Sequence, residues 1–234
     1  MGLLRSLRLV LAGPHRAGWP FIAAGGVVCL VGIFVSPWLA ACGAGFALAC
    51  LGFFRDPDRV PPGRPGLVVA PADGRVIAVG AASPPAELGM GSAMRPRISI
   101  FLSVLDVHVN RMPVSGRVTR IAYRTGRFFN ASLERASAEN ERNALALRLP
   151  DGRDLAVVQI AGLVARRIVC LVHEGDAVRL GERFGIIRFG SRTDLYLPPG
   201  VAALVEVGQI MVGGETVIAE LGGDGPALPP AEAP

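Results

Sequence analysis

The sequence predicts a mainly β protein, in which a barrel-like or sandwich-like β domain follows an N-terminal transmembrane helical hairpin. Two observations lead to this fold class. No charged residue occurs between residues 18 and 54, and residues 67–222 form a series of short β-branched runs separated by turn pairs such as Asp-Gly. The mean hydropathy of +0.45 and the 51% hydrophobic content indicate that the net charge of +5 favours a membrane surface over nucleic acid.

The uncharged stretch is too long for one spanning helix and divides at Ser36-Pro37. Proline suits the first turn of the second helix, because its missing N–H would have no intrahelical partner there. At ~1.5 Å per residue, each half reaches about 27 Å, close to the ~30 Å hydrocarbon core of a bilayer. A re-entrant hairpin that does not cross the bilayer stays open as an alternative. The positive-inside rule places both ends in the cytoplasm, because both flanks are basic: Arg5, Arg8, Arg16, Arg55, Arg59 and Arg64.

The expected domain organisation follows from these composition changes. It comprises a basic cytoplasmic N-terminus (1–17), the membrane hairpin (18–54), a proline-rich linker (55–66), the β domain (67–222) and a disordered tail (223–234). Within the β domain, the helical candidate is about residues 131–141. The segments EGDAVRLGERFG and VGQIMVGGETVIAEL are similar to the turns and strands of biotinyl- and lipoyl-type carrier domains.

The basic residues exclude three cofactor chemistries. The chain contains no lysine, so all 24 basic side chains are arginines. Lysine carries biotin or lipoate and forms the Schiff base with pyridoxal phosphate, and none of these can occur here. The four cysteines and three histidines lie far apart with no CxxC pair, which predicts that the protein has no metal site.

Three residues have the chemistry of a serine, histidine and aspartate arrangement, whose geometry does not depend on chain order. Ser191 follows Gly190 in RFGSRTDLYLP, His108 lies in SVLDVHVNRMPVSG, and Asp73 lies in APADGRV. The G-x-S-x-G elbow of hydrolases is absent. By local sequence alone, a structural interpretation stays open for each residue, as a strand corner, a hydrogen-bonded strand end and a hairpin turn respectively.

Several segments in the same order resemble one family, phosphatidylserine decarboxylase in its short bacterial and archaeal-type form. They are PADGRV, LDVHVNRMPVSGRV, GRFFNASLERASAENERN, VHEGDAVRLGERFGIIRFGS and RFGSRTDLYLP, and the resemblance covers about residues 50–200. It implies a proenzyme that cuts itself between Gly190 and Ser191, through attack of the serine hydroxyl on the preceding carbonyl. Elimination and hydrolysis then leave a pyruvoyl group, on an α chain (191–234) that forms a heterodimer with a β chain (1–190).

The resemblance also implies the reaction and the roles of two residues. The pyruvoyl carbonyl forms a Schiff base with the amine of phosphatidylserine, and loss of CO2 gives phosphatidylethanolamine without pyridoxal phosphate or a metal. Asp73 matches the aspartate that assists self-cleavage, and His108 matches the first histidine of D-x-H-x-x-x-M-P. Longer relatives have a second histidine where this chain has Arg111, which cannot accept a proton at neutral pH. Either His108 serves both steps or Arg111 orients the serine.

The remaining expectations concern the substrate and the membrane. Arginine binds phosphate through two donors, so the candidates for the lipid phosphate are Arg111, Arg124, Arg127 and Asn130. The expected location is the inner membrane of a bacterium, with the catalytic domain on the cytoplasmic side. Three alternatives stay open: another seryl phospholipid, a soluble amino acid as substrate, or a non-enzymatic membrane-anchored β domain. A higher oligomer and the acyl-chain preference are left undecided.

Overall fold

A computed structural model of the chain describes residues 12–126, 131, 139–162, 167–188 and 191–222. The chain divides into two compact units, Met1–Asp58 and Arg59–Pro234. Four expectations lie wholly or mostly outside the described residues: Gly190, Arg127 with Asn130, the helical candidate at 131–141, and the tail at 223–234.

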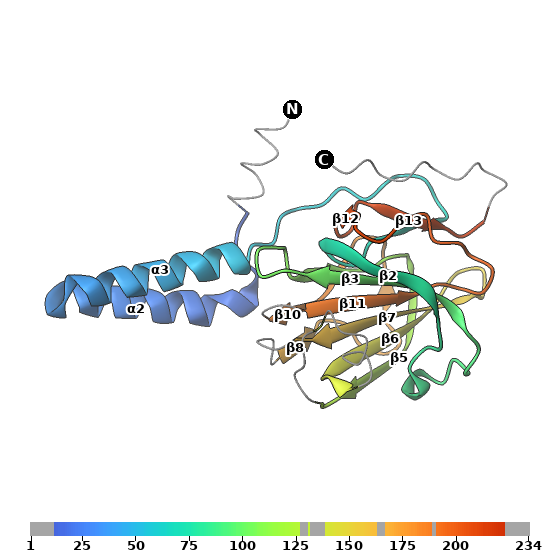
Figure 1. Ribbon diagram of the computed structural model, residues 1–234, viewed down its shortest axis with the longest axis horizontal. Coiled ribbons are helices and arrows are strands. Elements are labelled where there is room, and N and C mark those ends of the chain that lie inside the picture. The colour runs from blue at the N-terminus through green and yellow to red at the C-terminus, as the bar shows by residue number, and fades with distance from the viewer. Residues whose placement is uncertain (1–11, 127–130, 132–138, 163–166, 189–190, 223–234) are drawn as a thin grey trace. The chain divides into compact units, whose positions relative to one another are not determined.

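The first unit is a pair of apolar helices (Figure 1). A short 3-10 helix, η1 (Arg16–Gly18), leads into α2 (Trp19–Val35), and α3 (Pro37–Phe53) follows after Ser36, which is extended. The two helices pack closely because glycine lies at their contacts. A Cβ added at Gly32 would lie 2.2 Å from Ala40 N, which is closer than side chains can approach.

One of these helices has the dimensions of a membrane span. Within the described part of the chain, Arg16–Val35 is the one helix long and apolar enough to cross a bilayer, with a mean hydropathy of 2.1 over its most apolar window. The helix Pro37–Phe53 is apolar but shorter. The apolar N-terminal helix is in keeping with membrane association, and full spanning by the hairpin stays a prediction.

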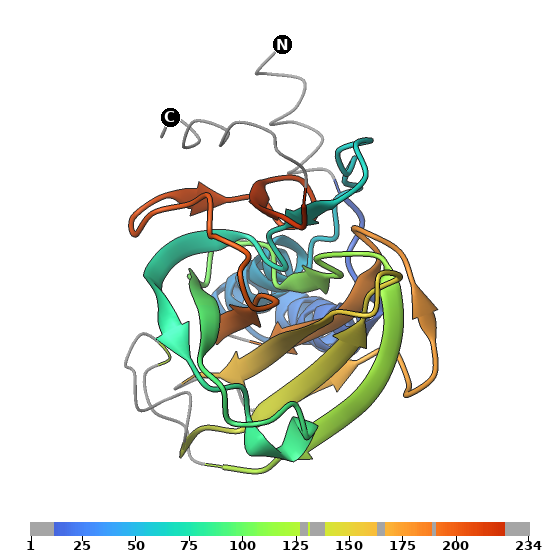
Figure 2. The same cartoon turned by 90° about the vertical axis from the view of Figure 1, so that its right-hand side faces the viewer.

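The second unit is mainly β, as the sequence predicts. Its largest sheet has eight strands in the order β12-β2-β3-β11-β7-β6-β5-β9, all paired antiparallel, and curls into a half-barrel (Figures 1 and 2). Its strands are β2 (Gly74–Ala82), β3 (Arg95–Leu102), β5 (Gly116–Arg124), β6 (Arg142–Arg148), β7 (Asp154–Ala161), β9 (Ala177–Val178), β11 (Ser191–Tyr196) and β12 (Ile210–Met211). The likeness of its hairpins to carrier domains stays a prediction.

Two smaller antiparallel sheets complete this unit. One contains β4 (Val109–Arg111), β10 (Arg183–Arg188) and β8 (Arg167–Cys170), and the other pairs β1 (Leu67–Val69) with β13 (Val217–Glu220). A 3-10 turn, η2 (Ala86–Leu88), lies between β2 and β3. Because β10 and β11 belong to different sheets, the chain passes from the three-stranded sheet to the eight-stranded sheet between residues 188 and 191.

The two faces of the large sheet pack into different clusters. Since side chains alternate along a strand, Leu195 of β11 faces the main core with Ile98 and Val157, which are its cross-strand partners. Tyr196 faces a smaller cluster that includes Leu88 of η2. All six residues of β11 are buried, so the strand that begins at Ser191 lies inside the domain.

Candidate active site

Ser191 is the first residue of β11 and is fully buried. The strand register places it opposite Leu102 of β3 and Ala161 of β7. Its alternation with Leu195 directs its side chain to the core face. Its Oγ has no hydrogen-bond partner among the residues that the structure describes. A buried hydroxyl in that state costs about 1–3 kcal/mol, so this side chain does not stabilise the fold through a hydrogen bond.

His108 is also fully buried and lies directly before β4. Its carbonyl accepts a hydrogen bond from Ile187 N at 3.3 Å, and Ile187 precedes Ser191 by only a few residues. Its ring Nδ1 lies 2.9 Å from the Asp106 carbonyl oxygen. A carbonyl oxygen only accepts, so Nδ1 is the donor in this contact, and in a neutral ring Nε2 would then be the basic nitrogen.

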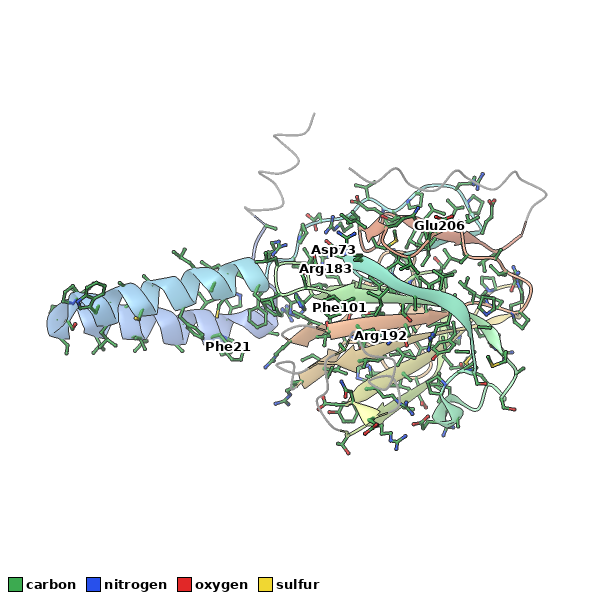
Figure 3. The ribbon with its side chains drawn as sticks, viewed as in Figure 1. Phe21, Asp73, Phe101, Arg183, Arg192 and Glu206 are labelled. Atoms are coloured by element: carbon green, nitrogen blue, oxygen red, sulfur yellow. The ribbon has the colours of Figure 1, made fainter. Side chains whose placement is uncertain are left out.

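Asp73 lies in the turn before β2, at the same end of the large sheet. Pairing through β3 makes Arg75 of β2 level with Arg192 of β11, and two strand spacings separate their backbones by roughly 10 Å. Figure 3 shows Asp73 and Arg192 at this end. Asp73 Oδ2 accepts from Arg59 Nη2 and Oδ1 accepts from Gly213 N, both at 2.7 Å.

Gly74 fixes the Asp-Gly turn at this edge. Its φ of +143° belongs to the region that favours glycine, and an added Cβ would lie 2.1 Å from the Phe101 carbonyl oxygen. The hairpin interpretation of this turn is wrong, because β1 pairs with β13 and β2 pairs with β3 and β12, so the turn connects two sheets and positions Asp73 between them.

A buried amide cluster lies on the same face of the sheet as Ser191. Asn143 Nδ2 donates to Gln159 Oε1 at 3.0 Å, and Gln159 Nε2 donates to Asn110 Oδ1 at 2.7 Å. Gln159 is the cross-strand partner of Thr193. In the described part of the chain, Asn110 Nδ2 and Thr193 Oγ1 are buried without a hydrogen-bond partner. These polar atoms, together with Ser191 Oγ, form a buried polar site.

The amide cluster also relates His108 to Ser191. His108 and Asn110 alternate onto the same face of their strand. The strand β4 is antiparallel to β10, which leads toward Ser191. The direction along β4 from Asn110 to His108 is therefore the same as the direction along β11 from Thr193 to Ser191. Sequence analysis did not identify this cluster; the signal was a single amide in each of two buried strands, NALALR and AVVQIAG.

The arginines predicted to bind the lipid phosphate lie elsewhere. Arg111 Nη1 donates to the Gly181 carbonyl oxygen at 3.0 Å, and alternation places Arg111 on the opposite face of β4 from Asn110. A Cβ added at Gly214 would lie 2.7 Å from Arg111 Cδ and 3.6 Å from Arg59 Cβ, so Arg111 lies on the side of Asp73 and its partner Arg59. Both the serine-orienting and the phosphate-binding roles of Arg111 stay predictions.

Arg124 ends β5, and its Nη1 lies 3.6 Å from Glu87 Oε1. Arg124 is paired with Arg142, and Arg142 is paired with Ile160, which belongs to the smaller cluster. Arg124 therefore lies on the face of the sheet that packs into this cluster. This is the face opposite to Ser191, and the phosphate-binding role of Arg124 stays a prediction.

A buried ion pair lies directly after Ser191 on the opposite face of β11. Arg192 Nε donates to Asp194 Oδ1 at 2.6 Å, Nη2 donates to Oδ2 at 3.0 Å, and Nη2 also donates to Ser99 Oγ at 2.9 Å. Both side chains are 1% exposed. This pair holds the start of β11 against β3.

The chain thus combines an apolar N-terminal helix, in keeping with membrane association, with a β domain in which a serine and a histidine are fully buried. The family model described as phosphatidylserine decarboxylase matches residues 46–219. The chain belongs to this family of carboxy-lyases, which excludes the non-enzymatic alternative.

Three relatives from curated proteins support this membership, and each is named phosphatidylserine decarboxylase proenzyme. The protein of Granulibacter bethesdensis is 64% identical over 221 residues, which are 94% of this chain and 91% of the relative. That of Gluconobacter oxydans is 60% identical and covers 94% of this chain and 100% of the relative. The Mycobacterium tuberculosis protein is 54% identical and covers 93% and 94%.

Proposed function

We propose that this chain decarboxylates phosphatidylserine to phosphatidylethanolamine, after cutting itself between Gly190 and Ser191. The observation that carries the proposal is the place of Ser191: it is buried, its Oγ has no hydrogen-bond partner within the described residues, and it stands where the chain crosses from one sheet to another. A chain break between residues 190 and 191 leaves the pairing of residues 192–196 with β3 and β7 in place.

The self-cleavage follows from the groups at this edge. His108 Nε2 takes the proton from Ser191 Oγ, which attacks the Gly190 carbonyl and shifts the acyl bond from nitrogen to oxygen. Glycine leaves this carbonyl open to attack because it has no Cβ. A base then removes the Cα proton of residue 191 while the Gly190 carboxylate leaves from Cβ, which gives dehydroalanine. Its imine tautomer adds water and releases ammonia, and this leaves the pyruvoyl group. That group supplies Schiff-base chemistry, which binds the substrate amine and takes up the electrons as CO2 leaves.

His108 is proposed as the proton carrier for both steps. It has the basic Nε2, and its strand position relates it to Ser191, whereas Arg111 cannot accept a proton and lies on the other face of β4. Asp73 assists as a positioning residue, since its bonds to Arg59 and Gly213 hold the edge next to β3. Thr193 Oγ1 and Asn110 Nδ2 are donors for the developing negative charge of the attacked carbonyl.

The two chains stay together after cleavage as a heterodimer. The strand β11 belongs to the shorter chain, and it pairs over six residues with β3 on one side and β7 on the other. Both neighbours belong to the longer chain. Separating the two chains would expose both edges of a buried central strand. The free energy of this exposure is far larger than the free energy lost when one peptide bond no longer links the chains.

The apolar helix Arg16–Val35 supports a substrate held in a bilayer rather than a soluble amino acid. We infer that the hairpin attaches the enzyme to the inner membrane of a bacterium, with the β domain on the cytoplasmic side because arginines flank the hairpin. A seryl phospholipid with a different backbone has the same head group and remains within the proposed chemistry.

Intact mass measurement on a denatured sample tests this proposal. We expect two chains, with residue 191 at the blocked start of the shorter chain, and conversion of phosphatidylserine to phosphatidylethanolamine by the purified enzyme. Ser191→Ala should remain one chain, whereas Ser103→Ala, which changes an exposed serine near the same edge, should cut normally. A single uncut chain in the unmodified protein would overturn the proposal.

A further inference from the structure

The turn between β3 and β4 carries two exposed aliphatic side chains. Val104 is 56% exposed and Leu105 is 83% exposed. They occupy the two corner positions of a tight turn in which Asp106 N donates to the Ser103 carbonyl at 3.0 Å, and Ser103 N donates to Asp106 Oδ2 at 2.7 Å. Turn corners favour glycine, proline, asparagine and aspartate, so folding alone does not account for a Val-Leu tip.

This turn lies at the edge where Ser191 begins its strand. Leu102 is paired with Ser191 in the register, and the turn starts at the next residue. At its other end the Asp106 carbonyl holds the Nδ1 of His108. The exposed tip and the buried catalytic pair are therefore joined by a few residues of hydrogen-bonded backbone.

Two arginines lie at the same edge. Arg188 is the last described residue before Ser191, and it is paired with Arg167 of β8. Partial burial, and then the charge of Arg167, lower the pKa of Arg188, but an arginine remains charged at neutral pH. Two adjacent positive charges beside an apolar tip match the interface of an anionic bilayer, in which acyl chains lie below phosphate groups.

We propose that the Val104-Leu105 turn inserts into the lipid bilayer beside the active site, with Arg167 and Arg188 directed to anionic head groups. This inference rests on the proposed function, because it explains how a lipid head group reaches Ser191 while its acyl chains stay in the membrane. The turn also orients the His108 ring through the Asp106 carbonyl. The same four residues, 103–106, therefore contact the bilayer and orient the catalytic ring.

A tryptophan depth measurement on the full chain tests the insertion. The native tryptophans, Trp19 and Trp38, are first replaced by phenylalanine, and Leu105→Trp is compared with the control Met94→Trp. Met94 is 61% exposed and precedes β3 at its opposite end, roughly 25 Å away at ~3.3 Å per residue. In vesicles of phosphatidylcholine and phosphatidylglycerol with brominated acyl chains, we expect at least threefold stronger quenching of residue 105. Equal quenching at the two positions would overturn the proposal.

A kinetic comparison separates insertion from chemistry. Leu105→Asp should lower turnover of phosphatidylserine in vesicles about tenfold, through KM, and change turnover of a monomerically dispersed short-chain phosphatidylserine less than twofold. Met94→Asp should leave both unchanged, and both variants should still cut themselves. Equal losses on the two substrates would refute a membrane role for the turn. Absence of cleavage and turnover in the unmodified protein would instead refute the proposed function, while the quenching result would stand by itself.

Discussion

Gln159→Met should destabilise the β domain through the amide cluster. Methionine has a similar length and no hydrogen-bonding amide, so the change removes the bonds to Asn143 and Asn110 while filling nearly the same volume. Both partners are at most 1% exposed, and each buried polar group left unpaired costs about 1–3 kcal/mol. The expected loss is about 2–6 kcal/mol of unfolding free energy, a large part of the ~5–15 kcal/mol typical of a domain.

The assay is pulse proteolysis in urea on detergent-solubilised protein. Every variant also contains Ser191→Ala, so that each remains a single uncut chain. The matched control is Gln209→Met, because Gln209 accepts from Glu206 N in an exposed turn. We expect less than about 0.5 kcal/mol for this control, as for surface substitutions in general.

A second variant identifies the cause. If Gln159→Met destabilises by leaving polar partners unsatisfied, then adding Asn110→Leu and Asn143→Leu should restore most of the stability, because replacing all partners by apolar groups is nearly neutral. Self-cleavage, measured with Ser191 present, should stay slow in both variants because Asn110 is lost or misplaced. A single variant that costs less than about 1 kcal/mol, or a triple variant as unstable as the single one, would refute the reasoning.

Three further predictions concern other contacts. Asp194→Leu should cost about 3–5 kcal/mol in urea unfolding, because it leaves the Arg192 guanidinium buried without its carboxylate; adding Arg192→Met should recover much of this loss. Gly74→Ala should slow self-cleavage strongly on a time-course gel, whereas Gly80→Ala, where a Cβ meets nothing within 4 Å, should cut at the normal rate. Burial and a neighbouring carboxylate raise the pKa of Tyr123 to about 12, so its ultraviolet titration should lie near pH 12, and its contribution to stability should be lost as the pH rises from about 10. A titration midpoint near pH 10 in the folded protein would contradict the last prediction.

Residue type and the family resemblance were sufficient to select candidate residues, whose catalytic roles stay predictions. Ser191, His108 and Asp73 were singled out from the sequence, and the structure places all three at one edge of the β domain. Asn110, Asn143 and Gln159 were not, because each is one amide in an apolar strand. Only the pairing of β6, β7 and β4 shows that the three meet.

The position of Arg111 could not be predicted from the sequence. In the sequence, Arg111 lies only one residue farther from His108 than Asn110 does, and the side chain of either residue could face the serine. Strand alternation separates them, since the Arg111 side chain binds the Gly181 carbonyl on the other face. Along a strand, side chains lie on the same face of the sheet only at every second residue.

Two properties of this chain depend on local chemistry and could be read from its residues alone. The apolar helices and their separation at Ser36-Pro37 follow from hydropathy and from the missing N–H of proline, and the β character of the second unit follows from β-branched runs between turns. The tertiary structure alone decided that β10 and β11 belong to different sheets, so that Ser191 stands at a crossover with a buried hydroxyl. That outcome depends on which strands pair across long stretches of chain, and non-local register is a property that no short segment encodes.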